Sequence, residues 1–304
     1  YRYFKEVIMI LNVSGRTDVV AFYSKWFLNR YKEGFVDVRN PFNEKLVSRI
    51  FFDDLDLIVF CTKNPIPILN HLKEIKKSIV FHVTLTPYEK DIEPNVPSKG
   101  MIINAIKKLS EIVGIDNLYI RYDPVFINKK YNIGYHIKTF DDLCKRLDGY
   151  VRNIIISFID YYKNVERNMK VLDYRELTYE EYEKIGINFA KSAKNHNMTV
   201  QTCAEKYNLA EYGFKKSDCI TEEMVKKITG KINKKKWKAR KNKNCNCIEM
   251  VDIGSYNTCK HFCKYCYANY DEKKVENNYL KHDPNSSLLI GKITESDIIK
   301  IRKE

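Results

Sequence analysis

Short apolar runs rich in β-branched residues recur along the chain and alternate with segments of helical periodicity. Runs that are apolar almost throughout are typical of parallel strands that helices cover on both faces. The pattern therefore predicts strands over residues 7–13, 57–61, 79–85, 118–122, 153–158, 199–202 and 248–253.

Amphipathic segments lie between these runs and predict helices. Thr178, followed by Glu181, predicts a capping box at the start of the last helix. The long gap after the first helix holds two short runs, residues 34–39 and 45–52, which predict an inserted hairpin. The predicted helices cover residues 19–31, 67–76, 99–113, 135–147 and 179–196, and a further helix is expected to begin at Tyr267.

Strand and helix alternate six or seven times, which predicts an α/β fold of the (β/α)6-7, TIM-like class, a complete or incomplete barrel. No G-x-G-x-x-G or G-x-x-x-x-G-K-[ST] motif follows a predicted strand, so an open nucleotide-binding sheet is disfavoured. We expect β/α barrel units over residues 1–214, and a cysteine-rich segment over residues 215–304 that completes the same domain. Active sites of such barrels lie in the loops after the carboxyl ends of the strands.

The composition is that of a globular protein with a full core, since 44% of the 304 residues are hydrophobic. No apolar run approaches the roughly 18 residues of a membrane span, and the first residues do not resemble a secretory signal. The nine cysteines are concentrated after position 200, which indicates metal ligation rather than a disulfide framework. We therefore expect a cytoplasmic protein that does not enter a membrane.

The formal net charge of +14 favours a polyanionic partner such as a nucleotide or nucleic acid. Eight basic residues lie between Lys231 and Lys243, around Trp237, whose ring could stack on a base. A solvated loop is the competing interpretation of this basic segment, because runs of charge commonly face water.

The most specific motif is C-x3-C-x2-C, formed by Cys259, Cys263 and Cys266. Three thiolates at this spacing can hold three irons of a 4Fe-4S cluster and leave the fourth iron open to a small chelating molecule. A tetrahedral zinc site is the alternative, with Cys245 or Cys247 as a further ligand. The compact triad favours the iron-sulfur cluster, because zinc-finger ligands normally come as two short pairs.

Four other cysteines flank the same predicted end of the sheet and are Cys203, Cys219, Cys245 and Cys247. They could ligate a second 4Fe-4S cluster or a zinc ion, or they could be unrelated buried thiols. Cys61 and Cys144 lie in apolar contexts and are expected to pack in the core.

The cysteine triad resembles the cluster loop of radical S-adenosylmethionine enzymes, and its Cys-Lys-Tyr-Cys-Tyr-Ala form is similar to that of spore photoproduct lyase. The resemblance implies a 4Fe-4S cluster, S-adenosylmethionine as cofactor and an electron donor such as flavodoxin or ferredoxin. It also implies a circular permutation, because the cluster loop follows the last predicted strand here and the first strand in ordinary members. The turn at Ser14, Gly15 and Arg16 would then replace the glycine-rich segment that holds the cofactor amine.

Along nearly the whole chain the sequence resembles the family called domain of unknown function 1848. Many of the matching segments begin where a predicted strand ends, so their polar side chains should converge on one mouth. Thr84 and Ser157 are expected to bind the cofactor's ribose or adenine, and Arg121 its carboxylate. Lys63 should line the mouth, and Asp123, Asp160 and Glu205 are the candidates for substrate or proton handling. The matching segments are residues 13–18, 38–43, 62–65, 85–88, 121–124, 156–160, 202–205 and 282–286.

These features favour a radical enzyme that cleaves S-adenosylmethionine reductively and abstracts hydrogen from a substrate, with a nucleotide or nucleic acid as the preferred class. A zinc-stabilised nucleic-acid-binding protein would explain the charge and the cysteines, but not the polar segments that follow the strands. An electron carrier or redox sensor is disfavoured, because its irons would all have protein ligands.

Overall fold

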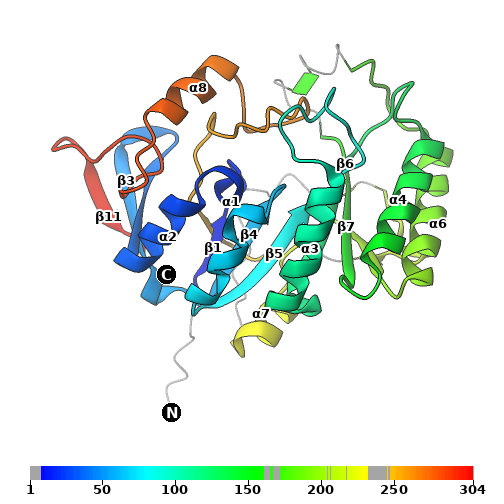
Figure 1. The fold of residues 1–304 in the computed structure, drawn as a ribbon, viewed down its shortest axis with the longest axis horizontal. Helices are drawn as coiled ribbons and strands as arrows, with labels where there is room; N and C mark the ends of the chain where they lie inside the picture. The colour runs from blue at the N-terminus through cyan, green and yellow to red at the C-terminus, as the bar shows by residue number, and fades with distance from the viewer. Residues whose placement is uncertain are drawn as a thin grey trace.

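The computed structural model describes residues 8–160, 165–166, 172–203, 205, 207–216, 218–231, 245 and 247–303. Its centre is an eight-stranded sheet in which every neighbouring pair of strands is parallel (Figure 1). The strands are β1 Ile10–Val13, β4 Leu57–Thr62, β5 Ser78–Thr84, β6 Leu118–Val125, β7 Asn153–Phe158, β8 Thr199–Thr202, β9 Lys215–Lys216 and β10 Val251–Asp252.

Helices connect most of these strands, as the alternating pattern predicts. The capping box at Thr178 and Glu181 is confirmed at the start of α6. The α-helices are α1 Val19–Phe22, α2 Ser24–Glu33, α3 Lys99–Val113, α4 Ile133–Leu147, α6 Tyr179–Asn195, α7 Glu222–Thr229 and α8 Glu272–Leu280. The 3-10 helices are η1 Phe52–Asp54, η2 Ile66–Glu74, η3 Ile115–Asn117 and η4 Ala210–Tyr212.

Three predicted helices differ from the structure for local reasons. The segment over residues 19–31 divides into α1 and α2 at Tyr23, whose buried hydroxyl donates to the Thr258 carbonyl. Residues 66–74 form a 3-10 helix instead, with Pro65 at its N-cap and Pro67 in its first turn. The helix expected from Tyr267 begins instead at α8, where Asp271 caps the first turn.

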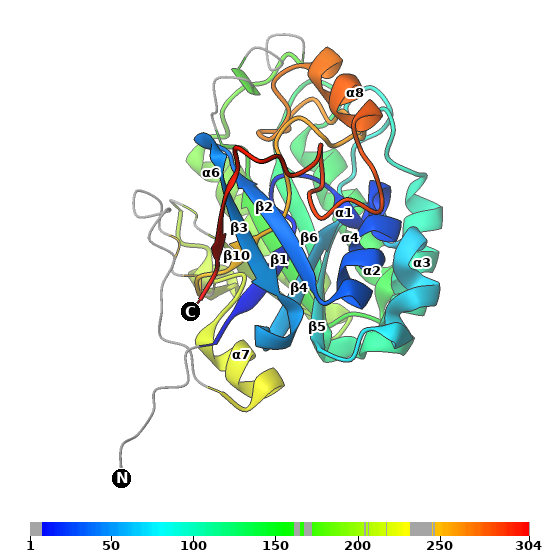
Figure 2. The ribbon, with the colours of Figure 1, turned by 90° about the vertical axis from the view of Figure 1, so that its left-hand side faces the viewer.

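The inserted hairpin is confirmed as an antiparallel pair, β2 Phe35–Asn40 and β3 Asn43–Phe51. The strand β11 Ile298–Ile301, which the sequence analysis missed, pairs in parallel with β3 and completes a three-stranded sheet. Figure 2 shows this small sheet at the flank of the large sheet, with the end of the chain beside it.

The order of strands in the large sheet is β10-β1-β4-β5-β6-β7-β8-β9. From β1 to β9 each strand lies beside the one that precedes it in this sheet, without the reversal of a doubly wound fold. The last strand, β10, lies on the free side of β1. Because all strands run the same way, their carboxyl ends lie together, at the end of the molecule where Figure 1 shows α8.

Alternate residues of each strand point to opposite faces of the sheet and pack in two apolar clusters. Leu11, Ile58 and Ile154 belong to the main core beneath the helices, as do Trp26 and Phe189. Their strand neighbours Ile10, Val59 and Ile155 belong to a second cluster that also contains Cys203 and Cys219. The face of the sheet opposite the main core is thus an interior surface as well, and Met224 and Val225 of α7 pack in its cluster.

We predict that His136 makes the protein sensitive to acid. Burial lowers the pKa of this imidazole from 6.5 to about 4, and its ring contacts the Tyr122 hydroxyl and the Phe126 carbonyl. Below pH 6.5 the imidazole is therefore protonated in the unfolded chain, whereas in the folded protein it stays neutral until the pH falls to about 4. This contribution to stability is present above pH 6.5 and is lost as the pH falls toward 4.

Urea unfolding at pH 7 and pH 4.5 measures this loss. Between the two pH values the wild type should lose roughly 2 to 3 kcal/mol more than a His136→Gln variant. The exposed His71 provides the control, since His71→Gln should keep the acid sensitivity of the wild type. Equal acid sensitivity of His136→Gln and the wild type would contradict the prediction.

Candidate metal and cofactor site

The three cysteines of the motif lie in the loop that joins β10 to α8, at the carboxyl end of the sheet. Cys259 and Cys263 are buried, Cys266 is half-buried, and none of these three described residues forms a disulfide. Burial, Cys266 and Cys263 all raise the pKa of the Cys259 thiol, so the three sulfurs are electrostatic neighbours. Phe262 adopts a left-handed backbone conformation, with φ of 54°, which turns the loop between two of the thiols.

Asp252, the last residue of β10, holds the amino-terminal turn against the start of this loop. Its carboxylate accepts hydrogen bonds from the Asn12 amide at 2.8 Å, the Ser14 hydroxyl at 2.9 Å and the Gly15 amide at 2.6 Å. The Arg16 guanidinium adds an ion pair at 3.0 Å and also donates to the Asp252 carbonyl. The residues predicted to hold the cofactor amine are therefore oriented by a carboxylate that the sequence analysis did not identify.

Gly254 permits this close approach of the turn to the loop. A Cβ atom at position 254 would lie 1.9 Å from the Ser14 hydroxyl oxygen, a distance that no side chain tolerates. The backbone amide of Gly254 also donates to Asp252 at 2.8 Å. Glycine is thus required at this position for β10 and the turn to meet.

Asp18 ties the cluster loop to two other segments. One carboxylate oxygen accepts from the His261 ring at 2.9 Å and from the Lys63 backbone amide at 2.7 Å. The other oxygen accepts from the Ala21 amide and caps α1. His261 lies between Cys259 and Cys263 in the sequence, so this buried contact fixes the path of the loop between two thiols.

Glu93 forms a buried charge network behind the loop and is only 1% exposed. It accepts from Lys63 at 2.8 Å and from Lys99 at 2.5 Å, and the hydroxyls of Thr86 and Tyr265 also donate to it. Burial alone would raise the pKa of Glu93, but the two ammonium groups lower it to about 2. Tyr265 stands between Cys263 and Cys266, so this network anchors the second half of the loop.

Lys63 connects the cluster loop to the predicted mouth. Burial opposes its charge, but Glu93, Cys263 and Asp123 raise the pKa of its ammonium group. Lys63 is therefore an electrostatic neighbour of a cluster thiol and of a predicted catalytic carboxylate at once. Lys63 therefore remains a predicted residue of the mouth.

Arg121, on β6, makes two buried contacts at the same end of the sheet. Its guanidinium holds one Asp123 carboxylate oxygen through two hydrogen bonds, at 3.0 Å and 2.5 Å. It also donates to the sulfur of Cys219 at 2.9 Å. Arg121, proposed from sequence to bind a cofactor carboxylate, thus already pairs with one carboxylate of the protein.

The remaining predicted residues end neighbouring strands. Ser157 and the Phe158 amide both donate to one Glu205 oxygen at 2.9 Å. Thr84, at the end of β5, is in register with Arg121 of β6. Burial raises the pKa of Glu205 to about 7, and the charges of Asp123 and Asp160 add to this effect. Glu205, Asp123 and Asp160 are therefore electrostatic neighbours. The turn at Ser14 is oriented by a different carboxylate, that of Asp252.

Three of the four other cysteines meet in space. The sulfurs of Cys203, Cys219 and Cys247 lie within 4.8 Å of one another, and all three residues are buried. They come from segments that are far apart in the sequence, so their proximity supports a ligand set for a metal ion or cluster.

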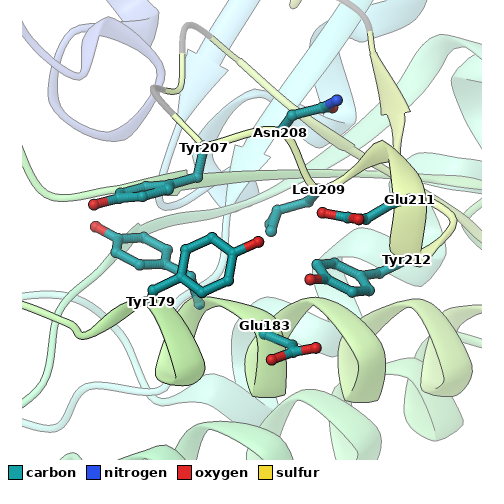
Figure 3. Close-up of a pocket in the computed structure, with 8 residues that line it drawn as sticks. Tyr179, Glu183, Tyr207, Asn208, Leu209, Glu211 and Tyr212 are labelled. Atoms are coloured by element: carbon teal, nitrogen blue, oxygen red, sulfur yellow. The ribbon is translucent and has the colours of Figure 1, made fainter.

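A pocket of about 240 Å³ lies elsewhere, between α6 and the loop that contains η4. Figure 3 shows Tyr179 of α6 and Tyr207 and Tyr212 of the facing loop around it. None of the residues predicted from sequence to bind a cofactor or metal lines this pocket.

Two further sequence-based expectations concern the basic segment and the membrane. The basic segment from Lys231 to Lys243 lies, except for its first residue, outside the described residues, as does Trp237. In the part of the chain that the structure covers, no helix is long and apolar enough to cross a membrane.

The profile of one protein family, described as Domain of unknown function (DUF1848), matches residues 10–268. This range includes the turn at Ser14, the mouth residues and all three cysteines of the motif. No curated protein matches the chain significantly.

We predict that Asp252 is required to assemble the loop. In an Asp252→Asn variant the partly buried Arg16 loses its ion pair, and one carboxylate acceptor becomes an amide donor. The free energy of unfolding should fall by about 2 to 4 kcal/mol, and iron uptake on anaerobic reconstitution should fall with it.

Urea unfolding and iron analysis test both expectations. Asp54→Asn, at an exposed carboxylate, is the matched control and should change neither quantity. Wild-type stability and iron uptake in Asp252→Asn would show that the loop does not depend on this carboxylate.

Proposed function

The chain belongs to the DUF1848 family, and we propose that it is a radical S-adenosylmethionine enzyme whose Cys259, Cys263 and Cys266 ligate a 4Fe-4S cluster. The observation that carries this proposal is the position of the three thiols. They are buried or half-buried and gathered in one loop at the carboxyl end of a parallel sheet, where neighbouring strands end in polar side chains.

The donor set suits such a cluster. Three thiols from one short loop can ligate three irons and leave the fourth to a small-molecule chelator. Among the described residues, the next cysteines in the sequence, Cys245 and Cys247, belong to the separate group around Cys203 and Cys219. When bound, the cluster and S-adenosylmethionine together supply a carbon-centred radical that abstracts hydrogen from the substrate.

The residues of the mouth would bind and orient the cofactor and substrate. Ser14, Gly15 and Arg16 form a turn beside the loop that Asp252 has already oriented, so binding an amine there requires little further ordering. Thr84 and Ser157 would bind ribose or adenine, and Arg121 the carboxylate of the cofactor. These assignments use the ends of three neighbouring strands, β5, β6 and β7.

Three carboxylates are proposed to handle the substrate and its protons, namely Asp123, Asp160 and Glu205. Burial and the negative charges of Asp123 and Asp160 raise the pKa of Glu205 to about 7, which favours the protonated form of Glu205 near neutral pH. A carboxyl group in this state can donate a proton or a hydrogen bond to a bound molecule. The ammonium group of Lys63 would partly neutralise the negative charge of these carboxylates and of the cluster thiolates.

We also propose that the sheet is a circularly permuted form of the radical-enzyme barrel. The cluster strand β10 lies directly beside β1, and the strands then follow in chain order to β9. A chain that began just before β10 and continued into β1 would have the cluster loop first, as in ordinary members of the class.

The proposed substrate class is a nucleotide or nucleic acid, because the net charge of +14 attracts polyanions. The proposed electron donor is a small redox protein such as flavodoxin or ferredoxin.

An electron paramagnetic resonance experiment tests the proposed function. Anaerobically reconstituted, dithionite-reduced protein should give a 4Fe-4S signal that changes when S-adenosylmethionine is added, because the cofactor binds the open iron. A Cys263→Ala variant should lose the cofactor-sensitive signal. Cys144→Ala removes a buried thiol in α4 and is the matched control, which should keep it.

A protein that shows no cluster signal, or a signal that S-adenosylmethionine does not change, would overturn the proposal. Formation of methionine and 5'-deoxyadenosine from the cofactor under the same reducing conditions gives a second readout. This product assay should fail in Cys263→Ala and succeed in Cys144→Ala.

A further inference from the structure

Four cysteines of this chain come together on the face of the sheet opposite the main core, apart from the cluster motif. Cys203 directly follows β8 and Cys219 comes shortly after β9, whereas Cys245 and Cys247 precede β10. All four are buried, with exposed fractions between 3% and 9%. We propose that they bind a single zinc ion, and that this ion joins the two ends of the eight-stranded sheet.

The spacing of the sulfurs favours one ion over a second cluster. A zinc ion holds each thiolate at about 2.3 Å, which places the four sulfurs roughly 3.8 Å from one another. In a 4Fe-4S cluster each thiolate binds a different iron, so the sulfurs lie farther apart. The sulfurs of Cys203, Cys219 and Cys247 all lie within 4.8 Å of one another, which is close enough for one ion to reach all three.

The second cysteine set is also tighter than the cluster motif of the same protein. Among the described residues, no other group of three potential ligands is this compact, so the sulfurs of Cys259, Cys263 and Cys266 spread more widely. The contrast is the one expected for a single ion at one site and an iron-sulfur cluster at the other.

Cys245 lies beside this group of three and is the proposed fourth ligand. The side chain of Cys245 is within hydrogen-bonding reach of both Cys203 and Cys247. Four thiolates are the usual ligands of a closed, structural zinc site, which leaves no position open for a reaction. This set therefore points to a structural role, in contrast to the three-thiol motif.

The Arg121 guanidinium supplies positive charge beside the proposed zinc site. Four thiolates and one zinc ion carry a net charge of −2, which is costly to bury without a cation. The Arg121 guanidinium donates to the Cys219 sulfur at 2.9 Å, and it also pairs with Asp123. Arg121 therefore connects the zinc site to the predicted mouth as an outer-shell partner of a ligand.

The ligands come from both ends of the sheet. In the described residues β9 and β10 are the two edge strands and do not pair with each other. Cys203 and Cys219 approach from the β9 edge and Cys245 and Cys247 from the β10 edge. The backbone amide of Ile248 donates to the Ile220 carbonyl at 3.1 Å, so the two edges also touch directly beside the thiols.

A metal ion at this junction would hold the curved sheet closed. The cysteines pack against Ile10, Val59 and Ile155 on the inward face, so the ion would lie inside the curvature. Structural zinc ions contribute directly to folding, because the unfolded chain lacks a preformed site. The inference does not rest on the proposed radical chemistry, since these four thiols are separate from the cluster motif.

Metal analysis of purified protein tests the inference. A triple variant, Cys259→Ala, Cys263→Ala and Cys266→Ala, leaves the second cysteine set intact and should retain about one zinc ion per chain while losing its iron. A double variant, Cys219→Ser and Cys247→Ser, should lose at least about fivefold in zinc content. Cys144→Ala is the control and should keep the wild-type content of both metals.

Two further measurements keep the test decisive if the double variant fails to fold. Cobalt introduced into the triple variant should show the visible absorption of a tetrahedral thiolate site. Removal of zinc from the same variant with a thiol-directed mercurial and a chelator should lower its melting temperature by about 10 °C or more, and added zinc should restore it.

Other outcomes would overturn the inference. About four irons in the triple variant, or about eight in the wild type, would identify a second 4Fe-4S cluster. A metal-free triple variant, with or without a disulfide between Cys203 and Cys219, would show that these thiols bind no ion. Loss of the cofactor-sensitive cluster signal alone would count against the proposed function and leave the zinc site standing.

Discussion

The contact between Asp252 and the turn at residues 14–16 is the constraint on which the rest of the site depends. One carboxylate at the end of β10 accepts hydrogen bonds from a backbone amide, a hydroxyl, an amide side chain and a guanidinium, and so fixes the last strand of the large sheet beside the first. The cysteine loop begins immediately afterwards. Its position relative to the other strands therefore follows from this single anchor, with Gly254 providing the space that the anchor needs.

Buried and half-buried charges hold the rest of the site, and each is compensated. Glu93 lies between two lysines, and Arg121 lies between Asp123 and the Cys219 sulfur. An isolated charge at such depth would be strongly destabilising, whereas a fully bonded network can fix one arrangement of side chains. The predicted mouth is thus built from fixed ion pairs on rigid strands, which is how binding and catalytic groups are held in position.

The apolar periodicity predicted the central strands and the long helices, because burial on two faces leaves a clear signal in sequence. It could not predict β11 or the short extent of β10, since those strands depend on partners from distant segments. The cysteine motif was visible through its spacing. The roles of Asp252, Glu93 and His261 were not, because a lone carboxylate or imidazole has no pattern until folding supplies its partners. The meeting of Cys203, Cys219 and Cys247 likewise depends on folding, because the three residues come from separate segments of the chain.

The pairing of β10 with β1 also sets the order in which the protein can mature. Asn12 and Asp252 are separated by 240 positions, so the first strand emerges from the ribosome long before its neighbour exists. Contacts of such long range form late and slow folding. The cysteine loop can reach its final shape only after residue 252 has been synthesised and docked. A metal ion or cluster that this loop binds could therefore reach its final site only after β10 has joined β1.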